Sequence, residues 1–387
     1  PAGEDDLLQG FEEDSPEIGA QPAREEKEPA AWQLEGEVAF TGIYNISPDA
    51  ESPWKGISML RPELDLTLKN KLSSRWQGQI SVRGFYDAVY AVRGRDNYST
   101  QVLDEYEQEI ELRDTYILGS LTDSLDIKIG RQVVVWGTLD NLRATDILNP
   151  MDLRVPGLTD IEDLRLPVTM VKLDYYFGSW DLSGIVMPEV RFSKGPVFGS
   201  DFYPYPIPAP PEDKPDNGFQ NGPCAAALKG VFSGMDIAFY WADLYADQAY
   251  LEPASTGVAG QYVRRYPRIR MLGAAGDVAA GNWLFKGEAA WNDGLRYTST
   301  PGTEYTRFDL GGGVEYAGFD ETSISLEAVN RHLYDYDDSL GLFPDEVREV
   351  EFQWSLRISR DLMHDTLTLT LLASTYGVKA DDGAFER

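Results

Sequence analysis

Cysteine, histidine and long apolar runs are scarce in this chain of 387 residues. Cys224 is the only cysteine, so no disulfide forms within the chain, and with His332 and His364 as the only histidines a Cys/His zinc site is out of reach. No run of 18 or more apolar residues occurs, which excludes a protein that crosses a membrane with helices. Basic residues number 34 against 64 acidic ones, and the formal charge of -30 makes a nucleic-acid partner unfavourable.

The residues that are abundant favour strands and turns. The chain has 36 Gly, 23 Pro, 21 Tyr, 16 Phe and 9 Trp. Glycine and proline are typical of tight turns, and aromatic residues are typical of pleated, half-buried sheet surfaces. We therefore expect an all-β protein.

The first 31 residues are strongly acidic, with ten Asp or Glu against two bases, Arg24 and Lys27. We expect residues 1–31 to form a disordered or extended periplasmic arm. No signal sequence precedes it, so we interpret the chain as the mature form after signal-peptide removal. The arm is a candidate contact for a periplasmic or export-system partner. An acidic, solvated tail on a soluble protein is the alternative.

Polar and apolar residues alternate from Trp32 onward. Glu63 and Asp65 alternate with Leu64 and Leu66, and the same pattern runs through residues 349–359. A period of two predicts strands with one polar and one apolar face, and nine to eleven such residues suffice to cross a bilayer. The expected strands are 36–47, 57–70, 76–92, 107–121, 123–137, 168–178, 179–189, 223–234, 235–246, 268–280, 282–295, 306–318, 321–332, 347–360 and 366–377.

Short and long connections alternate between these strands, for example Gly178-Ser179 followed by residues 190–222. This alternation is typical of an outer-membrane barrel with short periplasmic turns and long extracellular loops. We predict an antiparallel transmembrane β-barrel of about 16 strands over residues 32–387, in the bacterial outer membrane and in contact with its lipid and lipopolysaccharide. Because fifteen is an odd count, we expect that the last strand or strands are missing, or that one was merged or overlooked.

Aromatic residues mark the ends of several strands next to the short turns. They lie on the apolar face, so we predict a membrane girdle at the headgroup level. Packing inside a soluble sandwich is the alternative. The girdle residues are Trp76, Phe177, Trp180, Phe232 and Trp283.

One stretch carries a family resemblance. Gly130-Arg131-Gln132, Trp136-Gly137, Asn149-Pro150, Asp152 and Leu166-Pro167 resemble the signature of a proteobacterial outer-membrane β-barrel (porin-like) family of unknown function. The resemblance covers mainly residues 123–202. It implies an outer-membrane barrel that is porin-like or associated with the export of lipids or hydrophobic compounds.

Residues 138–167 form a connection far longer than a hairpin needs, and their charges alternate in sign. We predict that this loop folds into the lumen as a constriction; the alternative is that its polar residues only hold the loop's own fold. Both signs also occur on the inward faces of the strands, and the overall acid excess predicts a preference for cations. The candidate lumen and constriction residues are Arg131, Asp140, Arg143, Asp146, Asp152, Arg154, Arg61, Glu63, Arg83, Arg113, Arg307, Glu351 and Arg357.

No enzymatic site is expected, because His332 and His364 are far apart in the chain and neither has a nucleophile partner. We interpret Cys224 as a packing residue. No cofactor is expected apart from calcium in acidic loops, for which solvated loops are the alternative. The candidate calcium ligands are Asp335, Asp337 and Asp338 in one loop and Asp160, Glu162 and Asp163 in another.

Three function classes remain. The first is a porin-like channel for small polar solutes, the second a barrel component of a lipid or hydrophobic-compound export system, and the third a structural barrel with a blocked lumen. A homo-oligomer is compatible with all three.

Overall fold

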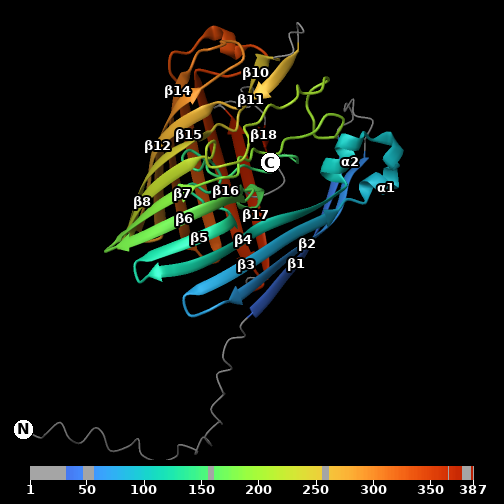
Figure 1. Cartoon of the computed structure of the whole chain (residues 1–387). Coiled ribbons are helices and arrows are strands. Elements are labelled where there is room, and N and C mark those ends of the chain that lie inside the picture. Colours follow the sequence, from blue (N-terminus) through green and yellow to red (C-terminus); the bar gives the residue numbers. More distant parts are fainter. Residues whose placement is uncertain are drawn as a thin grey trace, which may run out of the picture.

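The computed structural model describes residues 32–46, 56–155, 161–254, 261–364, 366–376 and 385–386. Most of them form a single antiparallel sheet whose tilted strands curve around a common interior (Figure 1). Its sixteen strands are β1 (Trp32–Asn45), β2 (Gly56–Lys71), β3 (Trp76–Tyr86), β4 (Gln108–Thr122), β5 (Leu125–Gln132), β6 (Val168–Phe177), β7 (Trp180–Val186), β8 (Cys224–Phe232), β9 (Met235–Tyr245), β12 (Arg268–Ala280), β13 (Trp283–Leu295), β14 (Tyr305–Phe319), β15 (Thr322–Leu333), β16 (Val350–Leu362), β17 (Leu367–Tyr376) and β18 (Phe385–Glu386).

The long connections contain short elements of their own. The hairpin β10 (Tyr250–Pro253) and β11 (Tyr262–Arg265) lies between β9 and β12. Figure 1 shows this hairpin and helices α1 and α2 at the end of the barrel that carries the long connections. The helices are α1 (Val89–Arg93), η1 (Arg95–Asn97), α2 (Thr100–Tyr106), α3 (Ile161–Leu164) and η2 (Asp338–Gly341).

Strand order confirms the predicted architecture. Each strand of the large sheet pairs with its neighbour in the chain, except that β9 pairs with β12 across the β10–β11 hairpin. All fifteen expected strands are present, and β18 adds a sixteenth by pairing with β17. Within the described residues, β1 pairs only with β2, so β1 and β18 are the two ends of the sheet.

The two faces of the sheet differ as the alternation predicts. On β2, Leu64 and Leu66 point outward with 45% and 40% of their surface exposed. Asp65 lies on the opposite face, where its carboxylate is 2.9 Å from the guanidinium of Arg83 on β3. An apolar outer surface of this extent is too large for a monomer in water and fits contact with lipid. Among the described residues, no helix combines the length and apolar character needed to span a bilayer.

Three strands end at least three residues earlier than the sequence predicts, because side-chain acceptors or a proline interrupt the backbone pairing. The expected strand 76–92 ends at Tyr86, since the Asp87 carboxylate accepts the N–H groups of Leu60 and Val89 and starts the helical segment. The expected strand 179–189 ends at Val186, because Met187 next faces Pro223, which accepts the Met187 N–H but has no N–H to donate in return.

The expected strand 123–137 ends at Gln132. Here the N–H of Val133 bonds to the Asp114 carboxylate and that of Val134 to the Asn149 side chain, at 3.1 and 2.8 Å. The chain thereby leaves the sheet five residues before the predicted strand end and enters the interior. The predicted arm 1–31 lies outside the described residues.

Candidate functional site

The connection from β5 to β6 packs inside the barrel. We call its described residues 133–155 and 161–167 the plug loop. Two side chains give it its local fold: Asn149 accepts from Val134 N at 2.8 Å, and the Asp146 carboxylate accepts from Trp136 N at 3.3 Å. Asp146 also pairs with Arg165 at 2.8 Å, and both are buried. The plug loop is therefore folded back on itself by buried polar contacts.

A buried glutamate on β13 holds the first turn of the plug loop. Glu288 is 4% exposed, and its Oε1 accepts the N–H groups of Thr138 and Leu139 at 2.6 and 2.8 Å. Its Oε2 accepts both the N–H and the hydroxyl of Thr145, at 3.0 and 2.9 Å. Gly137 allows the plug loop to approach Glu288 this closely, because its φ is +87° and a Cβ there would lie 2.2 Å from the Glu288 carboxylate. A side chain at this position would displace the anchor.

A second buried glutamate, on β15, holds the next residues. Glu327 is 1% exposed and accepts N–H groups of Asp140, Asn141 and Leu142 at 2.8, 2.9 and 3.1 Å. Successive backbone N–H groups that converge on one anion form an anion-binding nest, and here the anion is a carboxylate of the barrel wall. The two glutamates together fix residues 138–145 across the lumen from β5.

Apolar contacts fill the space between the plug loop and the wall from β6 to β15. The Trp136 ring stacks on Tyr240 of β9, with centroids 4.6 Å apart. Leu139 lies over Gly311 and Gly313 of β14, where an added Cβ would come within 2.7 and 3.1 Å of it. The buried cluster continues through small inward residues such as Ala242. This half of the interior is a packed core.

The other half of the interior is open and charged. A cavity of about 530 Å³, the charged cavity, lies between the plug loop and the inner faces of β1 to β4, lined by seven carboxylates and four arginines. Arg83 contacts Asp65 at 2.9 Å and Glu63 at 3.5 Å. Arg61 lies over the Phe85 ring at 3.9 Å. Arg113, by contrast, forms no ion pair within the described residues.

Ion pairs fasten the far end of the plug loop to this cavity. Arg154 is buried and contacts both Asp152 and Glu109. Burial alone would raise the pKa of Asp152, but the hydrogen bonds and charge of Arg154 outweigh it and hold the pKa below its usual value. For Arg154, burial is likewise outweighed by Asp152, which raises the pKa of the guanidinium. The pair stays ionised at neutral pH.

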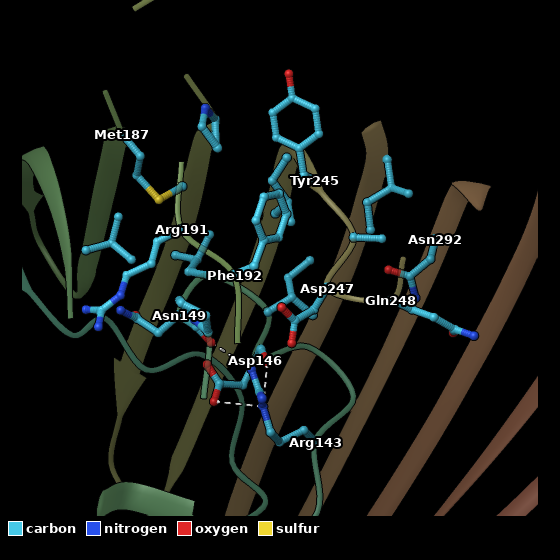
Figure 2. Close-up of a pocket in the computed structure, with 18 of the residues that line it drawn as sticks. Arg143, Asp146, Asn149, Met187, Arg191, Phe192, Tyr245, Asp247, Gln248 and Asn292 are labelled. Atoms are coloured by element: carbon cyan, nitrogen blue, oxygen red, sulfur yellow. Dashed lines mark hydrogen bonds and ion pairs between the residues drawn. The ribbon is translucent and has the colours of Figure 1, made fainter. Parts of the chain in front are cut away.

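A second cavity of about 330 Å³ lies on the long-connection side of the plug loop; we call it the vestibule. Figure 2 shows Arg143, Asp146 and Asn149 of the plug loop around it, together with Phe192 from the connection after β7 and Tyr245, the last residue of β9.

The structure brings most of the predicted lumen residues to these three places. Arg61, Glu63, Arg83, Arg113, Asp152 and Arg154 line the charged cavity, while Asp140 is on the plug loop and pairs with Lys286. Arg143, Asp146 and Arg307 line the vestibule. Three others lie nearby or apart: Arg131 pairs with Glu189 at 3.2 Å, Glu351 pairs with Arg331 at 3.3 Å, and Arg357 is on β16, lining neither cavity.

The two anchoring glutamates were not among the predicted constriction residues. Their cross-strand neighbours offer a signal: Glu327 faces Gly313 and Ser355, and Glu288 faces Gly311 and Ala275. An inward carboxylate without a basic neighbour on either adjoining strand needs its partner from elsewhere. That signal becomes readable only once the strand register is known.

The predicted girdle aromatics lie in one zone, at the short-turn ends of their strands. Trp76 covers Gly119 of β4, where an added Cβ would lie 2.2 Å from the ring. Trp180 contacts Phe232 edge-on at 5.5 Å, and Trp283 contacts Tyr316 at 4.5 Å. Phe177 pairs with Trp180 across the β6–β7 turn. Their role as membrane anchors stays a prediction.

The calcium prediction gains no support from the described part of the chain, where no three His, Cys, Asp or Glu side chains gather around a point that could hold a metal ion. Asp337 instead caps helix η2 by accepting the Ser339 N–H at 2.8 Å. In the other acidic group, Asp160 lies outside the described residues.

Residues 55–380 match a family described as "Protein of unknown function (DUF1302)". The search of curated proteins found no match. Among solved structures, a porin refined at 1.8 Å has 12% identity and a TM-score of 0.47, covering 91% of this chain and 96% of its own. The outer membrane channel DcaP of Acinetobacter baumannii has 11% identity and a TM-score of 0.48, covering 93% and 95%. OmpT, an outer membrane protein of Vibrio cholerae, has 10% identity and a TM-score of 0.49, and the match covers 92% of each chain.

Proposed function

The chain belongs to the DUF1302 family, and on that premise we propose that it is a porin-like channel of the bacterial outer membrane that passes small polar solutes through a lumen narrowed by the plug loop. The observation that carries the proposal is the asymmetric interior. The plug loop is bound to one half of the wall through Glu288 and Glu327, and a charged, water-accessible cavity remains against the other half.

Membrane location is supported by the outer surface. Leucines and aromatic residues face outward along the strands, for example Leu310 with 54% and Phe285 with 50% of their surface exposed. Such residues gain several kcal/mol together when lipid replaces water around them. Charged side chains gather on the inner face, where they meet one another and water.

Charge in the open half sets the expected selectivity. Carboxylates outnumber arginines seven to four in the lining of the charged cavity. Since opposed pairs such as Arg83 and Asp65 cancel locally, the remaining excess is negative and favours cations at low salt. Screening removes this preference as ionic strength rises.

Planar-bilayer recordings with the purified protein test the proposal. We expect step-like currents and a cation-selective reversal potential in a dilute salt gradient. The double variant E63Q/D65N removes two carboxylates from the charged cavity and should bring the reversal potential closer to zero. D123N is the control, because it removes one carboxylate from an exposed turn outside the charged cavity, where Asp123 lies 2.9 Å from Arg75. Clear anion selectivity of the unmodified protein would overturn the assignment.

A blocked structural barrel is the second candidate, and the extent of packing between the plug loop and the wall favours it. Liposome swelling separates the two. Sugars that enter liposomes bearing the protein support the channel, and sugars that stay outside while the protein is folded support the blocked barrel.

A further inference from the structure

The vestibule differs from the charged cavity in the chemistry that it offers. Its wall includes Leu148 of the plug loop, Phe192, and the inward residues Leu244, Ile269 and Leu295 at the ends of β9, β12 and β13. These side chains come from segments far apart in the chain and meet on one side of the cavity. At about 330 Å³ the vestibule has the size of a site for a small organic molecule.

The charged groups around the vestibule are already engaged with the protein. Four arginines and four carboxylates line it, and each has a partner among the described residues. In the contacts given below, six guanidinium groups stand against six carboxylates, so an ionised group of a ligand would meet no net counter-charge and would lose its hydration. The contacts are Arg143 with Asp146, Arg165 with Asp146, Arg131 with Glu189, Arg191 with Glu111, Arg307 with Asp309 and Arg331 with Glu351. Asp247 forms no ion pair within the described residues and instead accepts the N–H and the hydroxyl of Ser193.

Neutral hydrogen-bonding groups remain available. The side chain of Gln248 lies at the edge of the vestibule and forms no hydrogen bond within the described residues. Asn292 donates to Asp309 at 3.3 Å, and its amide oxygen accepts no hydrogen bond from the described part of the chain. A ligand with an amide or hydroxyl group could bond to these amides while its apolar body lies against the leucines and Phe192.

We propose that the vestibule is a binding site for small uncharged molecules with a ring-sized apolar body and one amide or hydroxyl group. The site, whose labelled residues are drawn in Figure 2, lies on the long-connection side of the plug loop, where a solute arrives before it reaches the constriction. The inference rests on the proposed channel function and names a class of solute for it. The charged cavity would then carry ions and water, and the vestibule would collect neutral solutes.

Ligand-observed NMR with the full chain in lipid nanodiscs tests the site, with benzamide as the probe. Benzoate and benzylammonium carry the same ring with a negative or a positive charge, and empty nanodiscs correct for partition into lipid. We expect saturable binding of benzamide and at least about tenfold weaker binding of both ions, which corresponds to about 1.4 kcal/mol. Equal binding of the three compounds, or no saturable binding of benzamide, would overturn the proposal.

Two variants locate the binding. Ala246→Phe fills the vestibule from the residue after β9, and Gln248→Ala removes an amide that is exposed. We expect at least about tenfold weaker benzamide binding for A246F and severalfold weaker binding for Q248A. Thr41→Phe is the control, since it adds the same ring to the charged cavity and should leave benzamide binding unchanged.

Benzamide binding that survives both A246F and Q248A would also refute the site. The β-sheet circular dichroism and heat-modifiable gel migration of each variant establish that it is folded. Because binding is measured without any current, its outcome is separate from that of the bilayer experiment. A non-conducting barrel that binds benzamide would remove the channel function and leave the binding site.

Discussion

Replacing Glu327 by glutamine tests whether buried carboxylates hold the plug loop in place. The Glu327 carboxylate accepts the N–H groups of Asp140, Asn141 and Leu142. A glutamine retains one acceptor oxygen and turns an NH₂ group toward at least one of these donors. A hydrogen bond to a charged group contributes about 1.5–3 kcal/mol, so E327Q should weaken the attachment of the plug loop by about 2–5 kcal/mol.

Single-channel recording measures the consequence. We expect E327Q channels to have a larger mean conductance and more frequent transitions between current levels than the unmodified protein. E315Q is the matched control: Glu315 lies on the inner face of β14, 3.5 Å from Lys286, and accepts no N–H of the plug loop in the described part of the chain. Current traces of E327Q and E315Q that cannot be told apart would refute the anchoring role of Glu327.

Two further predictions concern the same loop. Gly137→Ala should lower the stability of the folded barrel by about 1–3 kcal/mol, because its φ of +87° and the 2.2 Å contact of the new Cβ with Glu288 are both unfavourable. Thermal unfolding measures this loss. Gly281→Ala is the control, because Gly281 has φ +63° and nothing within 4 Å of an added Cβ, so its unfolding temperature should fall less. Acidification should loosen the far end of the plug loop, since the lowered pKa of Asp152 gives a stabilisation that is present above about pH 3.9 and is lost as the pH falls through the folded-state value. Current noise recorded from pH 6 to pH 2 should rise for the unmodified protein, and D152N should show elevated noise throughout; a pH response of D152N equal to that of the unmodified protein would contradict the assignment to Asp152.

The strands were predictable because their signal is local. Alternation in residues such as Leu64, Asp65 and Leu66 depends only on the pleat of a strand, in which successive side chains point to opposite faces. The same reasoning separated lumen residues from outer ones and predicted fifteen strands, all of which the structure contains. It overran the strand ends at Tyr86, Gln132 and Val186, because side-chain acceptors on Asp87, Asp114 and Asn149 and the missing N–H of Pro223 end the backbone pairing there.

The candidate site was predictable only as a set of polar residues. Length and charge marked residues 138–167 as a loop with a role in the lumen. The side of the barrel on which it packs could not be read from the chain, because Glu288 and Glu327 are about 145 to 190 positions away from the N–H groups that they accept. Nor could the sequence reveal that one half of the interior is apolar and the other charged.

Sequence alone thus determined the β architecture, the apolar outer face and the polar inner residues, since each follows from a period of two along a single strand. Tertiary structure alone decided where the plug loop lies, which carboxylates hold it and which two cavities it leaves. The physical reason is that a buried carboxylate must find donors wherever the fold supplies them. Here Glu288 and Glu327 find those donors in the backbone of a loop from the opposite side of the barrel.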